Sequence, residues 1–150
     1  MSTTTSTLND LIEILKDGQQ GFTEAARDVQ SADLKKMLSG FAMQREQFAS
    51  QLQVVAKNFG EDSPAKTGSV TGAVHRGWIH LKAAVADRDD HAILEECERG
   101  EDAAVTAYGD ALGGGELPAN VSDVIRKQFA EIQAAHDQVK ALRDSHPVSK

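Results

Sequence analysis

The chain has 150 residues, of which 40% are hydrophobic and 26% are charged, a balance typical of one globular domain with a single core. Its net charge of −7 argues against a nucleic-acid partner, because binding to phosphates depends on clustered Lys and Arg. The sequence contains neither an apolar run of about 20 residues nor a secretory signal, so no membrane partner is expected. A single cysteine cannot form an internal disulfide, which favours a reducing, cytoplasmic location.

Apolar residues recur at helical spacing along almost the whole chain, and no segment shows the sustained alternation of a strand. Residues 1–6 are polar and are expected to be a disordered tail, followed by a single helical domain over 7–146. Thr7 with Asp10 resembles a helix start, Ser31 an N-cap and Pro118 a first helical residue. The pattern predicts helices at about 7–30, 31–59, 70–86, 90–112 and 118–145.

The connections between these helices indicate the topology. The tight joint at 30/31 and the glycines at 113–115 predict antiparallel neighbours, whereas 60–88 is long enough to travel the length of a bundle. The favoured fold is therefore all-α: a ferritin-like four-helix bundle whose long crossover carries a short extra helix. A plain up-down-up-down bundle with a decorated loop is the alternative.

Polar residues interrupt the apolar stripes at a few positions. Arg45 falls midway between Phe41 and Phe48, and Glu101 falls at the same kind of position on a later helix. Burying one charge alone costs several kcal/mol, so such groups are expected to pair. The predicted polar core network consists of Arg45, Glu98, Glu101, Gln128 and His136. In one interpretation, this network sets the register of the helices.

A metal site is the competing interpretation, with iron or manganese bound by Glu98, Glu101, Glu131 and His136, and Glu24 as an outside candidate. Di-iron bundles use Glu-x-x-His motifs, because residues three apart project together into the core. No glutamate in this chain is followed by histidine at that spacing. Glu131 and His136 are five residues apart, which places them about 140° from each other around a helix.

Other candidate positions have simpler interpretations. His75, Trp78 and Lys82 on the predicted crossover helix could line a small-ligand patch, or could anchor and rim that helix. Cys97 is expected to be a small buried apolar residue, and Tyr108 a packed tyrosine with a satisfied hydroxyl group. No catalytic residue is predicted.

Several motifs resemble a bacterial family of uncharacterised four-helix-bundle proteins, a domain of unknown function in the ferritin-like superfamily. The resemblance covers about residues 8–144. It rests on His75-Arg-Gly-Trp, Leu81-Lys-Ala-Ala, Glu96-Cys-Glu-Arg-Gly-Glu-Asp, the stretch from Gln128 to His136, and Leu142-Arg-Asp. It implies a ferritin-like bundle in a bacterial cytoplasm and implies no particular reaction; members of the wider superfamily bind two metals and handle iron or oxygen.

These features together predict a non-enzymatic cytoplasmic bundle, with a stress-related or interaction role, that forms a homo-oligomer. The alternatives are a divergent metal-binding protein and a small-ligand carrier.

Overall fold

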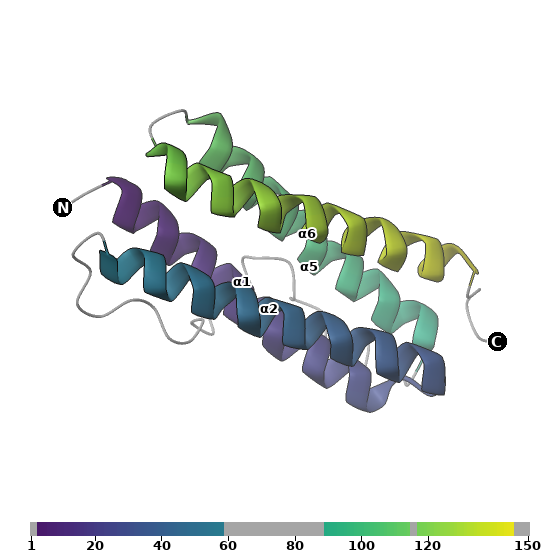
Figure 1. The fold of residues 1–150 in the computed structure, drawn as a ribbon. Coiled ribbons are helices and arrows are strands. Elements are labelled where there is room, and N and C mark those ends of the chain that lie inside the picture. Colours follow the sequence, from purple (N-terminus) through teal and green to yellow (C-terminus); the bar gives the residue numbers. More distant parts are fainter. Residues whose placement is uncertain (1–2, 59–88, 115–116, 146–150) are drawn as a thin grey trace.

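The computed structural model describes residues 3–58, 89–114 and 117–145, which form four helices (Figure 1). These are α1 (Thr3–Asp28), α2 (Ala32–Asn58), α5 (Asp90–Gly113) and α6 (Ala119–Ser145). No strand occurs within the three described ranges, so the all-helical prediction is confirmed for them. The helix predicted at 70–86, with His75, Trp78 and Lys82, lies outside the described residues.

The helix boundaries follow the predicted ones closely, with one correction at the start of the chain. Helix α1 begins at Thr3 rather than at residue 7, so residues 3–6 are helical and not part of a tail. Thr4 and Thr5 are buried, and this tertiary burial extends the helix into a stretch with no apolar period. Ser31 caps α2 as predicted, since its Oγ accepts from the Leu34 amide at 3.3 Å.

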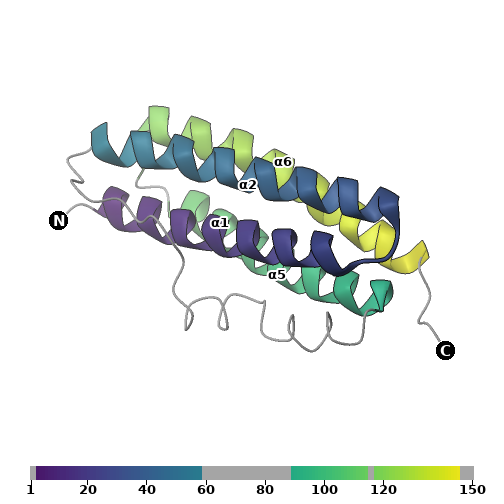
Figure 2. The same ribbon diagram turned by 90° about the horizontal axis from the view of Figure 1, so that it is seen from below.

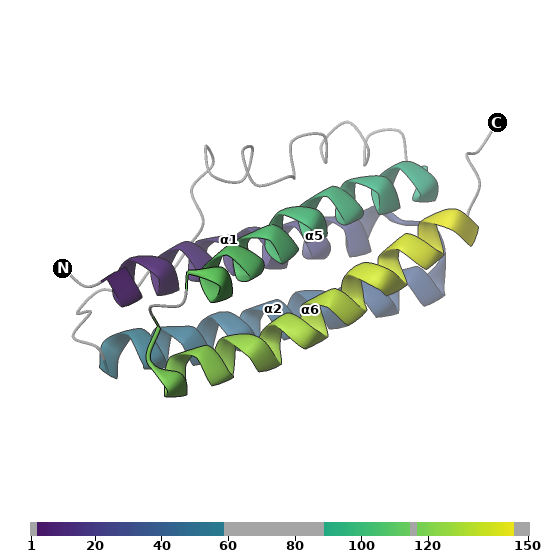
Figure 3. The same ribbon diagram turned by 90° about the horizontal axis from the view of Figure 1, so that it is seen from above.

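The four helices form a bundle in which α1 lies between α2 and α5, and α6 lies between α5 and α2 (Figures 2 and 3). Helices α2 and α5 therefore lie on a diagonal, and they run in the same direction (Figure 2). The Asp90 carboxylate accepts from the amides of Gln30 and Ser31 at 2.8 and 3.2 Å, which fixes the start of α5 beside the α1–α2 joint. Since α2 is about 40 Å long, the connection from α2 to α5 starts and ends at opposite ends of the bundle.

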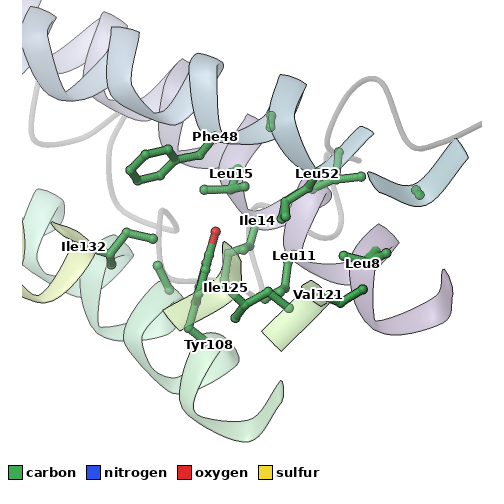
Figure 4. Packing of buried hydrophobic residues seen from close by; sticks show 14 residues of the cluster. Leu8, Leu11, Ile14, Leu15, Phe48, Leu52, Tyr108, Val121, Ile125 and Ile132 are labelled. Atoms are coloured by element: carbon green, nitrogen blue, oxygen red, sulfur yellow. The ribbon is translucent and has the colours of Figure 1, made fainter. Parts of the chain in front are cut away.

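Each helix buries one face in the bundle, and the buried side chains form two apolar halves. One half contains Phe22, Leu38, Cys97 and Val139, and the other contains Leu11, Phe48, Tyr108 and Ile132 (Figure 4). Along α2, Arg45 separates the residues of one half from those of the other. Glu101 has the same place along α5. None of the described helices combines the length and apolar character needed to cross a bilayer.

Candidate functional site

The centre of the bundle holds a salt bridge between Arg45 of α2 and Glu101 of α5. Nη2 of Arg45 donates to Oε2 of Glu101 at 2.7 Å, and Nη1 donates to Oε1, so the contact is bidentate. Each side chain is 1% exposed. Because α2 and α5 are diagonal, this pair joins two helices whose backbones make no close contact of their own. Bidentate hydrogen bonds between an arginine and a carboxylate are among the stronger hydrogen bonds in proteins.

Helix α1 completes the surroundings of the Arg45 guanidinium group. The ring of Phe22 lies 5.3 Å from Cζ of Arg45, within the range of a cation–π contact. One turn earlier, a Cβ atom on Gly18 would lie 3.7 Å from Cγ of Arg45, so α1 passes close to the arginine stem at this glycine. Nε of Arg45 donates to Oε1 of Gln44 at 3.2 Å. The centre of the bundle therefore accommodates a side chain that always carries a positive charge.

A second buried polar contact joins α5 to α6. The Tyr108 hydroxyl donates to Oε1 of Gln128 at 2.7 Å, and Nε2 of Gln128 donates to the Phe48 carbonyl at 3.3 Å and to Oε1 of Gln51 at 2.9 Å. Figure 4 shows Tyr108 among the apolar side chains of its half of the core, with its oxygen directed into the interior. Burial raises the pKa of Tyr108 above its ordinary value of 10, while the charge of Arg45 lowers it and that of Glu101 raises it. The phenol therefore remains a neutral hydrogen-bond donor.

The partner of Tyr108 was not predicted from the sequence, although a signal existed. Tyr108 lies five residues before the end of α5 at Gly113, and Gln128 lies nine residues after the start of α6 at Ala119. In an antiparallel helix pair, residues equally far from the connecting loop lie opposite each other. Equal counting would have placed Val124, one turn before Gln128, opposite Tyr108, so the spacing indicates the right part of α6 but not Gln128 itself.

Two members of the predicted network lie elsewhere, on the seam between α5 and α6. Glu98 accepts from Nη1 of Arg143 rather than from Arg45. Nε2 of His136 lies 2.5 Å from Oδ1 of Asp102, and its Nδ1 lies 3.3 Å from Oδ1 of Asp137. Both pairs are only partly buried. The network predicted as one cluster is thus a central pair, a Tyr–Gln contact and two seam pairs.

The carboxylate neighbours of His136 favour its protonated form. Partial burial lowers the pKa of His136, but the hydrogen bonds and negative charges of Asp102 and Asp137 outweigh it and raise the pKa above its ordinary value of 6.5. A protonated imidazole donates from both ring nitrogens, which suits two carboxylate neighbours.

The candidate metal ligands are held apart by these contacts. Glu101 binds Arg45, Glu98 binds Arg143, and His136 contacts Asp102, while Glu24 and Glu131 are exposed on other parts of the surface. Across the described ranges, no three His, Cys, Asp or Glu side chains gather as a set that could hold a metal ion. Of the candidate ligands, Glu98 and Glu101 therefore each bind a guanidinium group.

Cys97 is fully buried, and its surroundings suit a neutral thiol. Burial raises the pKa of Cys97, and the nearby Glu101 and Glu96 raise it further. Glu96 is also buried and accepts from Nη1 of Arg99 at 2.8 Å. A protonated thiol in this place acts as a small apolar side chain.

Comparison with curated proteins gives no match. A protein family described as "Domain of unknown function (DUF2383)" matches residues 3–114, which include α1, α2 and α5 together with the Arg45–Glu101 pair. Because this match extends over more than half of the 150 residues, the chain belongs to the DUF2383 family.

Proposed function

We propose that the protein is a non-enzymatic, ferritin-like helical bundle that works in the cytoplasm as an interaction protein and self-associates. In this proposal, the Arg45–Glu101 pair is a structural element that fixes the register of the helices. The parallel course of α2 and α5 supports the ferritin-like assignment, because ferritin-like bundles contain one long crossover connection. The bidentate Arg45–Glu101 contact is the single observation that carries the non-enzymatic part.

The argument from this contact is electrostatic. In di-iron bundles, inward glutamates meet the positive charge of two metal ions between the helices. Here the positive charge beside the inward glutamate is a guanidinium group, which is always protonated and is fixed on α2. A divalent cation bound to Glu101 would lie next to this charge, and their repulsion in a buried site would be strong.

A double substitution tests whether the pair is structural. Arg45→Met with Glu101→Leu replaces both charges by apolar side chains of similar length. We expect cooperative urea unfolding and a loss of no more than about 1 kcal/mol, because apolar replacement of a buried ion pair is often neutral or stabilising. Unfolding would be followed by circular dichroism.

The metal content of the purified protein is the second test of the proposed function. Wild-type protein and the Glu101→Gln variant would be purified from cells grown with added iron and manganese, and their metal would be determined by mass spectrometry. The proposal predicts the same low, substoichiometric content in both. Near-stoichiometric metal in the wild type that disappears in Glu101→Gln would replace the proposal with a metal-dependent function.

A further inference from the structure

One face of α2 is exposed and carries no charge over most of its length. Two large apolar side chains are exposed in the described part of the chain, Met43 at 63% and Val54 at 61%, and both belong to this helix. They are eleven residues apart, which places them within about 20° of each other around the helix. From Gly40 onward, the exposed residues of the same face, named here the neutral stripe, are Gly40, Met43, Gln47, Ser50, Gln51, Val54 and Asn58. The exposed charges Asp33 and Lys36 lie on this face only near the start of α2.

A groove lies directly beside the neutral stripe, between α2 and α6. These two helices are the least closely packed neighbours in the bundle, with sparse backbone contact between them. The open space measures about 530 Å³, and Val54 and Gln51 of the stripe form part of its α2 wall. Its full lining is Phe48, Gln51, Val54, Val55, Val124, Lys127, Gln128 and Glu131. The floor is apolar, and the α6 wall carries one positive and one negative side chain one turn apart.

The stripe and the groove complement each other. A helix presents a ridge of side chains, and ridges of one helix fit the grooves of another at an axial distance of about 8–10 Å. The neutral stripe offers apolar side chains for the groove floor and amides and a hydroxyl for Lys127 and Glu131 at its wall. Met43 and Val54 supply the large apolar groups that such a contact buries.

From this self-complementarity we propose that two copies of the chain associate through α2, with the neutral stripe of each copy lying in the α2–α6 groove of the other. The proposal rests on the interaction role proposed above and names its surface and its partner. Each copy contributes the same ridge and the same groove, so the contact is twofold symmetric and closes at a dimer.

Charge favours a second copy as the occupant. The chain has a net charge of −7, so two copies repel each other across most of their surfaces. The neutral stripe meets a wall whose charges balance, which removes like-charge contact from the interface. In a twofold contact, residues near the axis face their own counterparts, and a stripe of uncharged residues avoids pairing a charge with itself.

The test is a measurement of association in the full-length chain. Sedimentation equilibrium would be recorded over a wide concentration range for the wild type, Val54→Glu and the matched control Gln133→Glu. Gln133 is exposed on α6 and lies about 180° around the helix from the groove residue Val124. Both variants add one negative charge, but only Val54→Glu places it in the interface. We expect a wild-type dimer, an increase of about tenfold or more in the dimer Kd of Val54→Glu, and no change in the control.

Cross-linking provides an independent readout. Cys97 is buried, so a cysteine introduced at the exposed Gln47 reports alone. Gln47→Cys should form a covalent dimer with a short bis-maleimide, and Gln133→Cys should not.

The outcomes separate the two proposals. A monomeric wild type, or a dimer that Val54→Glu and Gln133→Glu weaken equally, overturns the inferred interface. The second of these results leaves self-association through another surface intact. Stoichiometric metal on Glu101 would overturn the proposed function without changing the prediction for Val54→Glu.

Discussion

Arginine–glutamate pairs join helices at two places in this bundle, with opposite exposure to water. Arg45 and Glu101 connect the diagonal helices α2 and α5, and each is 1% exposed. Arg143 and Glu98 connect the neighbouring helices α6 and α5, and their side chains are 25% and 14% exposed. The residue types are the same, but the central contact is bidentate, whereas Glu98 accepts from Nη1 of Arg143 and the other nitrogens of Arg143 donate to Asp144. The two sites therefore differ in both solvation and geometry.

This difference decides what each pair contributes. At the centre, both charges have lost water, and each depends on the other for compensation. At the seam, both side chains are partly exposed, so water can solvate part of a charge that loses its partner. The central pair therefore selects one alignment of α2 against α5, because a shifted alignment would leave two buried charges unpaired. The seam pair adds a local contact that the fold can lose.

The largest predicted effect comes from breaking the central pair on one side. Arg45→Ala leaves Glu101 buried without its cation, and we expect the free energy of unfolding to fall by about 3–5 kcal/mol. Urea denaturation followed by circular dichroism measures this change.

Arg143→Ala is the matched control, since it removes an arginine from the Arg–Glu pair that joins α6 to α5. Its loss should be smaller than that of Arg45→Ala, because Glu98 is 14% exposed whereas Glu101 is 1% exposed. Equal losses in the two variants would show that burial does not distinguish the pairs.

The central pair could be predicted from the sequence because two independent patterns agree there. Arg45 and Glu101 fall on apolar stripes of long helices, so their inward direction follows from helical period. Their mutual contact follows because neither charge can be buried alone. The four described helices were predicted for the same reason, since their apolar period continues over many turns.

The seam pairs could not be assigned in this way. Glu98 lies about 60° from Glu101 around α5. Helical periodicity therefore places it near the edge of the core but does not determine which neighbouring helix it contacts. That choice depends on the packing of α6 beside α5, which brings Arg143 and not Arg45 to Glu98. Likewise, the start of α1 at Thr3 depends on tertiary burial of Thr4 and Thr5, which a polar sequence does not signal.

A neutral buried contact should have an intermediate effect. Tyr108→Phe removes the hydroxyl that donates to Oε1 of Gln128 and leaves this buried acceptor without its donor. We expect the free energy of unfolding to fall by about 1–3 kcal/mol in urea denaturation.

Adding Gln128→Leu to Tyr108→Phe should recover part of this loss, because an apolar pair leaves no unsatisfied acceptor. If the double variant loses the sum of two large single effects instead, the Tyr108–Gln128 contact is not the source of the change.

The smallest predicted effect is a pH dependence at the seam. The pKa of His136 is raised in the folded protein, so folding favours its protonated form. Its stabilisation is fully present below the ordinary pKa of 6.5 and is lost as the pH rises through the higher pKa of the folded state. Because Asp102 is largely exposed and water screens its charge, we expect a contribution of less than about 1 kcal/mol.

The free energy of unfolding would be measured below and above this pH range for the wild type and for His136→Gln. The variant should lose the pH-dependent component of this free energy. His91→Gln is the control, since His91 lies 3.3 Å from Glu95 within α5. An unchanged pH dependence in His136→Gln would mean that Asp102 and Asp137 do not favour the protonated imidazole in the folded protein.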